Sequence, residues 1–299
     1  MDYVSKYTEF LKKHTDVKRP LKIVCDVSNG TTGIVLEKLG GIENLELILI
    51  NEKADPEFPA HGPNPLIEGA TDMLVRKVAE VKADFGVAFD ADGDRAFFVD
   101  NKGQLLPSYV TAAIWFKYST PPFVADELTY LSLTTSGLFT EKEVLPSRVG
   151  SLYVKEVLKD NDALLGVELS GHFYFKDFFG LDSGIFSMIY TANILGQQNK
   201  TLAQLNEELS VQSLTMKNIT LNKATWEVLR EAVKLGTATI TKAIFEREGL
   251  TLITENGWIN IRTSNTEPVV RIYVGAKTKE LAEHDMALIV KIVENTDAK

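Results

Sequence analysis

The chain has 299 residues, of which 44% are hydrophobic and 24% charged, with a formal net charge of −9. This is the composition of an ordinary water-soluble protein of two or three domains. The negative charge argues against a general affinity for nucleic acid, and no apolar run is long enough to span a membrane. The single cysteine, Cys25, excludes an internal disulfide framework and favours a cytoplasmic location.

The first third of the sequence predicts alternating helices and strands. The expected order is a helix over 4–14, a strand over 21–27, a helix ending at 40–41, a strand over 45–50, a helix over 71–82, a strand over 85–89, and a hairpin of 96–99 with 104–106. This alternation implies a parallel sheet with helices on its faces. We assign residues 1–106 to this first domain.

The rest of the chain predicts two more domains, over 107–212 and 213–299. The second is expected to hold a helix over 110–118, a strand near 128–133, a helix over 152–158, a strand near 164–168, and a helix over 182–195. The third is expected to hold a strand over 216–221, a helix over 224–235, a hairpin of 258–262 with 269–274, and a closing helix over 280–293.

Three aspartates at alternate positions, Asp90, Asp92 and Asp94, follow the apolar run at 85–89. Carboxylates this close repel one another unless a cation lies between them, and a hard divalent ion such as Mg²⁺ prefers oxygen ligands. A calcium EF-hand does not fit, because Arg95 and Asn101 occupy its glycine and glutamate positions. The alternative is a solvated acidic turn; three alternating aspartates at the end of a buried strand favour the metal site.

A second polar segment, residues 166–172, alternates Glu168, Ser170 and His172. In an extended stretch these three side chains point the same way. A carboxylate, a hydroxyl and an imidazole on one face can bind neighbouring hydroxyl groups of a sugar. An ordinary strand end with polar residues facing water is an equally good interpretation of this segment alone.

A third polar segment, residues 262–268, lies between two predicted strands. Arg262 offers a bidentate fork for phosphate, and Ser264, Asn265 and Thr266 add short polar groups. Successive turn residues can also direct backbone N–H groups at an anion. A polar hairpin turn without a ligand is the alternative. The sequence contains neither a Walker motif nor G-x-G-x-x-G, so a nucleotide site is not indicated.

The three segments, in this order and at these separations, resemble the α-D-phosphohexomutase family, which includes phosphoglucomutases and phosphomannomutases. The resemblance covers nearly the whole chain. It implies an α/β fold with two domains built on mixed sheets, followed by a smaller α+β domain that resembles the TATA-binding protein. The expected ligands are Mg²⁺ and a hexose phosphate, such as glucose or mannose 1-phosphate, the 6-phosphate or the 1,6-bisphosphate.

The resemblance also assigns roles to residues. It implies that Asp90, Asp92 and Asp94 hold Mg²⁺ and that Arg95 is the catalytic residue beside them. It implies that Glu168, Ser170 and His172 bind sugar hydroxyls, and that Arg262, Ser264, Asn265 and Thr266 hold the phosphate that does not react. The expected reaction converts a hexose 1-phosphate into the 6-phosphate through a bisphosphate intermediate.

Some features of the family are expected to be missing here. Its first domain carries a phosphorylated serine in a Thr-Ala-Ser-His-Asn-Pro type loop, and this string does not occur in the sequence. Its usual Asp-Val-Lys strand has Leu131-Ser132-Leu133 as nearest match, which lacks the lysine. Three explanations are left open: the chain is a fragment of a mutase that is inactive alone, it acts with a separate serine-bearing chain, or it binds sugar phosphates without catalysis. A metal-dependent phosphatase is a more distant alternative.

Overall fold

The computed structural model describes residues 2–209, 211–222, 226–236, 240–245, 248–264 and 269–298. Contacts between residues divide the chain into two compact units. The first comprises Met1–Val124 with Ser151–Leu209, and the second Ala125–Gly150 with Ser210–Lys299. Among the described residues, no helix combines the length and apolar character needed to cross a membrane. The three predicted domains, with boundaries at 106 and 212, stay a prediction.

The first sheet has the strand order β2-β1-β3-β4-β5. Its strands are β1 (Leu21–Asp26), β2 (Leu45–Ile50), β3 (Phe85–Phe89), β4 (Ala96–Asp100) and β5 (Leu105–Leu106). Strand β1 is parallel to β2 and β3, whereas β4 is antiparallel to β3 and to β5, so the sheet is mixed. The predicted strands and the 96–106 hairpin are confirmed.

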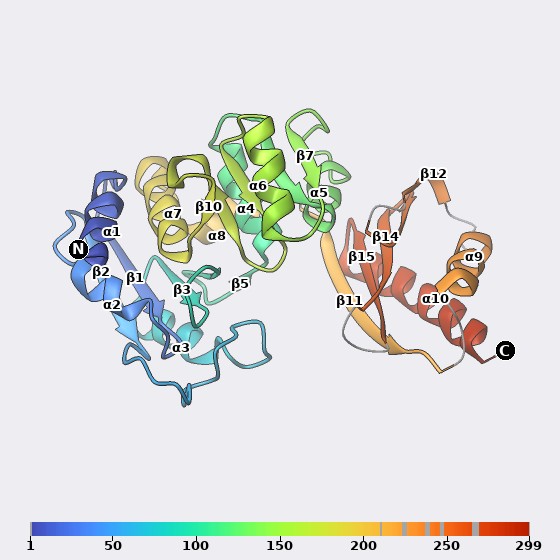
Figure 1. Cartoon of the computed structure of the whole chain (residues 1–299), viewed down its shortest axis with the longest axis horizontal. Helices are drawn as coiled ribbons and strands as arrows, with labels where there is room; N and C mark the ends of the chain where they lie inside the picture. The colour runs from blue at the N-terminus through green and yellow to red at the C-terminus, as the bar shows by residue number, and fades with distance from the viewer. Residues whose placement is uncertain are drawn as a thin grey trace. The chain divides into compact units, whose positions relative to one another are not determined.

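Four helical segments accompany this sheet: α1 (Tyr3–Lys13), α2 (Gly33–Leu36), the 3₁₀ turn η1 (Glu37–Leu39) and α3 (Asp72–Val81) (Figure 1). Helix α3 buries Leu74 and Val78 against the sheet. It packs closely because Gly86 of β3 has no side chain; a Cβ there would lie 2.6 Å from Val78. Cys25, on β1, is fully buried, with its Sγ 3.4 Å from the sulfur of Met188.

The second sheet has the order β10-β9-β8-β6-β7. Its strands are β6 (Phe123–Asp126), β7 (Val144–Ser147), β8 (Leu165–Val167), β9 (Phe173–Phe175) and β10 (Leu181–Asp182). The helices of this part of the chain are α4 (Ser108–Lys117), α5 (Glu127–Thr134), α6 (Ser151–Asp160), η2 (Lys176–Phe178), α7 (Gly184–Gln198) and α8 (Leu202–Glu207).

The expectation of a strand near 128–133 is wrong, because these residues form helix α5. Asp126 is the N-cap of this helix, and its carboxylate accepts a hydrogen bond from the backbone N–H of Thr129 at 3.0 Å. Six of the eight helical residues are buried. A short helix that is buried nearly all round does not show the 3.6-residue period of an amphipathic helix, and such a segment is easily taken for a buried strand.

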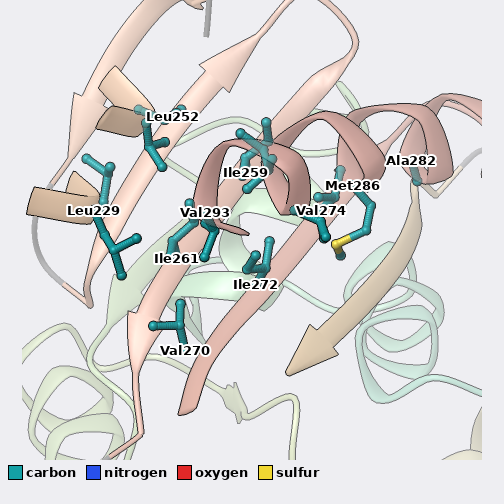
Figure 2. Close-up of a cluster of buried hydrophobic side chains, with 14 of the residues drawn as sticks. Leu229, Leu252, Ile259, Ile261, Val270, Ile272, Val274, Ala282, Met286 and Val293 are labelled. Carbon is teal, nitrogen blue, oxygen red and sulfur yellow. The ribbon is translucent and has the colours of Figure 1, made fainter. Parts of the chain in front are cut away.

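The C-terminal part of the second unit is an antiparallel sheet of order β11-β15-β14-β13-β12. Its strands are β11 (Ser213–Thr220), β12 (Ile240–Phe245), β13 (Leu250–Thr254), β14 (Gly257–Thr263) and β15 (Val269–Ala276), with helices α9 (Trp226–Gly236) and α10 (Lys279–Asp297). Alternate residues of β14 and β15 point into one core, which α10 covers with Met286 and Val293 (Figure 2). The structure thus has the predicted α/β class, with two mixed sheets and a separate antiparallel sheet.

A buried polar network joins α5 to this antiparallel sheet. The Thr251 hydroxyl and a Glu127 carboxylate oxygen are 3.1 Å apart, and the Asn260 amide donates to the same Thr251 oxygen at 2.8 Å. Asn260 also donates to the carbonyl of Glu248 at 2.9 Å. All three side chains are at most 4% exposed. This network explains why α5 belongs to the same compact unit as the C-terminal strands.

Candidate functional site

The loop between β3 and β4 is organised by Asp90, which is only 2% exposed. One of its carboxylate oxygens accepts hydrogen bonds from the backbone N–H groups of Gly93 and Arg95, each at 3.1 Å. The other accepts a hydrogen bond from the Arg95 Nε at 2.6 Å. Asp90 therefore shapes the loop and fixes the guanidinium of Arg95 beside it.

The three aspartates come together as the sequence predicted. One oxygen each of Asp90, Asp92 and Asp94 lies within 4.8 Å of the others. Asp92 is exposed, whereas Asp94 is half-buried. Burial, followed by the nearby charge of Asp90, raises the pKa of Asp94 to about 6. The three carboxylates therefore repel one another when they are ionised. Their oxygen-only donor set fits a hard divalent cation.

Two other segments contact this loop and hold it in place. The backbone of Gly30 lies against Ala91 so closely that a Cβ at position 30 would be 2.3 Å from the Ala91 carbonyl oxygen. The next residue, Thr31, donates its N–H to that oxygen at 2.9 Å. On the other side, Asn64 accepts a hydrogen bond from the Arg95 guanidinium at 3.4 Å. The turn after β1 and the 61–65 segment thus position the aspartates.

Glu168, Ser170 and His172 lie in the connection between β8 and β9. This segment is a tight turn, not the extended stretch expected: Gly171 has φ +94° and the Gly171 N–H donates to the Glu168 carbonyl at 3.0 Å. Ser170 Oγ and His172 Nδ1 are hydrogen-bonded at 2.8 Å. Glu168 is buried and accepts a hydrogen bond from the Tyr174 hydroxyl. The three residues are therefore close together, but the turn brings them there.

Backbone pairing joins this turn to the aspartate loop. Arg95 and His172 form an isolated antiparallel bridge, and the Ala96 N–H donates to the Gly171 carbonyl at 3.1 Å. The His172 imidazole lies 3.5 Å from a carboxylate oxygen of Asp94. Two segments about eighty residues apart in sequence thus build one polar site in the first compact unit.

Three residues near this site, Asp182, Lys155 and Tyr174, were not among the site residues predicted from the sequence. Asp182 has a carboxylate oxygen within 4.8 Å of ligand atoms on Asp94 and His172, and Lys155 lies 3.3 Å from Asp182. Asp182 and Ser183 begin the helix predicted over 182–195, and Ser183 is the N-cap of α7. Tyr174 continues the alternation of 168, 170 and 172, and that period could have identified it.

The Arg262 segment belongs to the second unit and is described by itself. The Arg262 guanidinium lies over the Tyr273 ring, 5.0 Å from its centroid, and donates to the Tyr273 hydroxyl at 3.2 Å. The Ser264 N–H donates to the Val269 carbonyl at 2.9 Å. Asn265 and Thr266 lie outside the described residues. The phosphate role of this segment stays a prediction.

Sequence models of the phosphoglucomutase/phosphomannomutase family match the chain in three places. They are α/β/α domain II over residues 1–103, α/β/α domain III over 138–212, and the C-terminal domain over 215–291. This chain belongs to that family. A curated relative, a phosphomannomutase from Escherichia coli, is 30% identical over 292 residues, covering 91% of this chain and 62% of its own length.

Solved structures of α-D-phosphohexomutases share the fold. A phosphoglucomutase/phosphomannomutase family protein from Burkholderia thailandensis superposes with a TM-score of 0.85 at 25% identity, covering 99% of this chain and 65% of the other. An Aspergillus fumigatus N-acetylphosphoglucosamine mutase, solved in complex with GlcNAc-6P and magnesium, gives a TM-score of 0.70 at 14% identity, covering 99% and 65%. The chain therefore spans about two thirds of these proteins.

Proposed function

We propose that this chain provides the metal-binding and hexose phosphate-binding parts of a phosphohexomutase that interconverts hexose 1-phosphates and 6-phosphates through a bisphosphate. The observation that carries the proposal is the Arg95–His172 bridge, which joins the aspartate loop to the Glu168–His172 turn. A cation site beside groups that can bind sugar hydroxyls is what phosphoryl transfer to a sugar needs. The magnesium and sugar phosphate bound by the A. fumigatus mutase agree with this proposal.

Each group has a proposed role. Glu168, Ser170 and His172 would bind the sugar hydroxyls, and Arg262 with Ser264, Asn265 and Thr266 would hold the phosphate that does not react. Asp90, Asp92 and Asp94 would hold Mg²⁺, which supplies charge neutralisation at a transferring phosphoryl group.

Arg95 is the proposed catalytic residue of this chain. Its Nε is occupied by Asp90 and one terminal nitrogen by Asn64. A guanidinium has five N–H donors, so others remain for a phosphate oxygen. Because Asp90 fixes its position beforehand, the charge needs little reorganisation when the substrate arrives.

The phosphoryl group itself is proposed to come from a serine, phosphorylated on a domain or chain that meets these loops in the cytoplasm. This part rests on the family relationship alone. The alternatives that the sequence left open, a split enzyme or a binding protein without catalysis, differ only in whether such a serine is supplied.

A coupled assay separates these possibilities. The chain is supplied with Mg²⁺, a trace of glucose 1,6-bisphosphate and either glucose 1-phosphate or mannose 1-phosphate, and 6-phosphate formation is followed. In parallel, calorimetry measures binding of the same sugars with and without their phosphate. Turnover that Asp92→Asn abolishes supports a complete active site.

Other outcomes of the assay are equally informative. Binding that requires the phosphate, without turnover, supports a partner that carries the serine, and adding a serine-bearing domain from a related mutase should then restore activity. Absence of phosphate-dependent binding would refute the proposed function.

A further inference from the structure

A cavity of about 620 Å³ lies within the second compact unit, away from the Arg262 segment. Its walls are the C-terminal half of α5 with the residues that follow, the residue before β11, and the turn between β13 and β14. The volume is within the range of small-molecule sites, about 300–1,000 Å³. Strand β14 runs from Gly257, at the cavity, to Arg262, a separation of about 17 Å at roughly 3.3 Å per residue.

One cavity wall carries a buried amide that lacks a full set of partners. Gln212 is 2% exposed, and its Oε1 lies 3.0 Å from the Thr135 hydroxyl. Its Nε2 has no hydrogen-bond partner among the described residues. If the amide were turned over, the oxygen would be left instead, so the deficit does not depend on the assignment. Buried polar groups are nearly always paired, so this amide would gain a hydrogen bond from a polar molecule in the cavity.

Two of the three walls, helix α5 and the β13–β14 hairpin, are joined by hydrogen bonds, which hold the cavity open. Glu127, at the start of α5, is linked through Thr251 of β13 to Asn260 of β14 by buried hydrogen bonds. Beyond the network, Arg148 and Glu248 form an ion pair at 3.3 Å. A ligand would therefore enter a preformed space, which lowers the entropy lost on binding.

The lining favours a particular class of ligand. The hydroxyls of Thr134 and Ser136, which line the cavity, donate to carbonyls of the preceding turn at 2.8 Å, so each keeps capacity to accept a hydrogen bond. The Gln212 amide adds one unpaired polar atom, and the rings of Tyr130 and Phe139 add apolar faces.

The charged residues of the lining argue against a phosphate. They are Glu141, Glu255 and Lys277, all exposed, which gives two negative charges for one positive. We propose that this cavity binds a neutral, hydroxyl-rich molecule of monosaccharide or disaccharide size, such as an unphosphorylated sugar. The cavity shares no residue with the proposed mutase site, and the proposal does not depend on that function.

Ligand-observed NMR, with saturation transferred from protein to sugar, tests this proposal on the full chain. The probes are glucose and maltose at millimolar concentration, with sucrose octasulfate as an anionic counterpart. Wild type is compared with Gln212→Leu, which removes the amide, and Thr134→Trp, which fills the space. Arg262→Ala serves as the control in the other sugar site. We expect binding of a neutral probe that both cavity variants weaken at least tenfold and that Arg262→Ala leaves unchanged.

Several results would overturn the proposal. These are no transfer to either neutral sugar in the wild type, binding that both cavity variants leave intact, or binding lost in Arg262→Ala. If neither cavity variant folds, competition in the wild type decides. Displacement of maltose by glucose 1-phosphate would place both in one site and refute a separate cavity, whereas independent binding of the two would support it. None of these results bears on whether the chain takes part in mutase turnover.

Discussion

Arg95 and His172 are paired across an antiparallel bridge, which fixes the aspartate loop in register with the turn between β8 and β9. Both residues have a second link to the same loop: Arg95 donates to Asp90, and His172 lies 3.5 Å from Asp94. A change in the carboxylate cluster should therefore alter the position of the residues proposed to bind sugar. The predictions below use this coupling and the packing beneath it.

Replacing Asp92 with Asn should lower Mg²⁺ affinity at least about fivefold. The lost charge is worth about 1 kcal/mol at 4 Å in water and more at a protein surface. Asp92 suits this test because it is exposed, so the substitution should not affect folding. Calorimetric titration with Mg²⁺ measures the change. Asp72→Asn, an exposed carboxylate on α3, is the matched control; equal affinities in both variants would contradict the metal assignment.

Stability without metal should depend on pH through Asp94. Its pKa is raised in the folded chain to about 6, from an ordinary value of 3.8. The folded chain then binds more protons than the unfolded one between about pH 4 and 6, so the free energy of unfolding falls as pH rises through this window. Asp94→Asn should show a smaller fall.

Urea unfolding of the wild type and of Asp94→Asn is measured in EDTA at several pH values between 4 and 7. Subtracting one pH profile from the other removes the contribution of the other titrating groups, which both proteins share. Adding Mg²⁺ should offset the loss in the wild type, because the cation binds the ionised carboxylates of the folded chain. Parallel pH profiles for the two proteins would argue against the raised pKa.

Gly30→Ala should destabilise the chain by about 1–3 kcal/mol, the usual range for overpacking. The added methyl group would clash with the backbone of Ala91, which cannot move without displacing the aspartate loop. Gly40→Ala is the matched control: its Cβ would find no atom nearer than 4.0 Å, so a change within about 0.5 kcal/mol is expected. Urea denaturation compares them, and similar losses for both would rule out the close approach at Ala91.

Tyr174→Phe should lower the free energy of unfolding by about 1–3 kcal/mol, because a buried charged acceptor, Glu168, loses a donor. It should also weaken binding of the sugar phosphate by freeing Glu168 to move. Among the described residues, the Tyr190 hydroxyl is hydrogen-bonded to the neutral Ser119, so Tyr190→Phe should cost about 0.5–1.5 kcal/mol and leave ligand affinity unchanged. A larger effect at Tyr190 would contradict the role given to Tyr174.

Arg262→Ala should weaken binding of hexose phosphate by about 1.5–3 kcal/mol, the range for hydrogen bonds to charged groups. Calorimetry with glucose 1-phosphate and with glucose separates the phosphate contribution. Arg76→Ala, an exposed arginine on α3 at 78% side-chain exposure, controls for the loss of net charge. If the variant and wild type bind glucose 1-phosphate equally well, another group holds the phosphate.

Most helices and strands of the first and last sheets were predictable because their patterns are local. The aspartate loop was also predictable, since three carboxylates following a buried strand are a short-range signal. Helix α5 was not predictable, because a short helix buried on nearly all sides shows no clear 3.6-residue period; its N-cap, Asp126, was the sign that could have identified it.

The rest of the site could not be predicted from the sequence, because it is assembled by tertiary contacts. Asp182 reaches Asp94 and His172 only because β10 pairs with β9, and the pairing register cannot be read from composition. The tight turn at Gly171 likewise reflects its bridge to the aspartate loop. The family resemblance pointed to both the aspartate loop and the Glu168–His172 segment, but not to the geometry that joins them.

The position of Cys25 makes the protein convenient for spectroscopy. Burial raises the pKa of its thiol, and the thiolate is the form that reacts with maleimides. A cysteine introduced at an exposed site, such as Leu152 at the start of α6 or Met216 on β11, would therefore be labelled alone in the folded chain. A fluorescent dye or a spin label can thus be attached to either compact unit without first removing the native thiol.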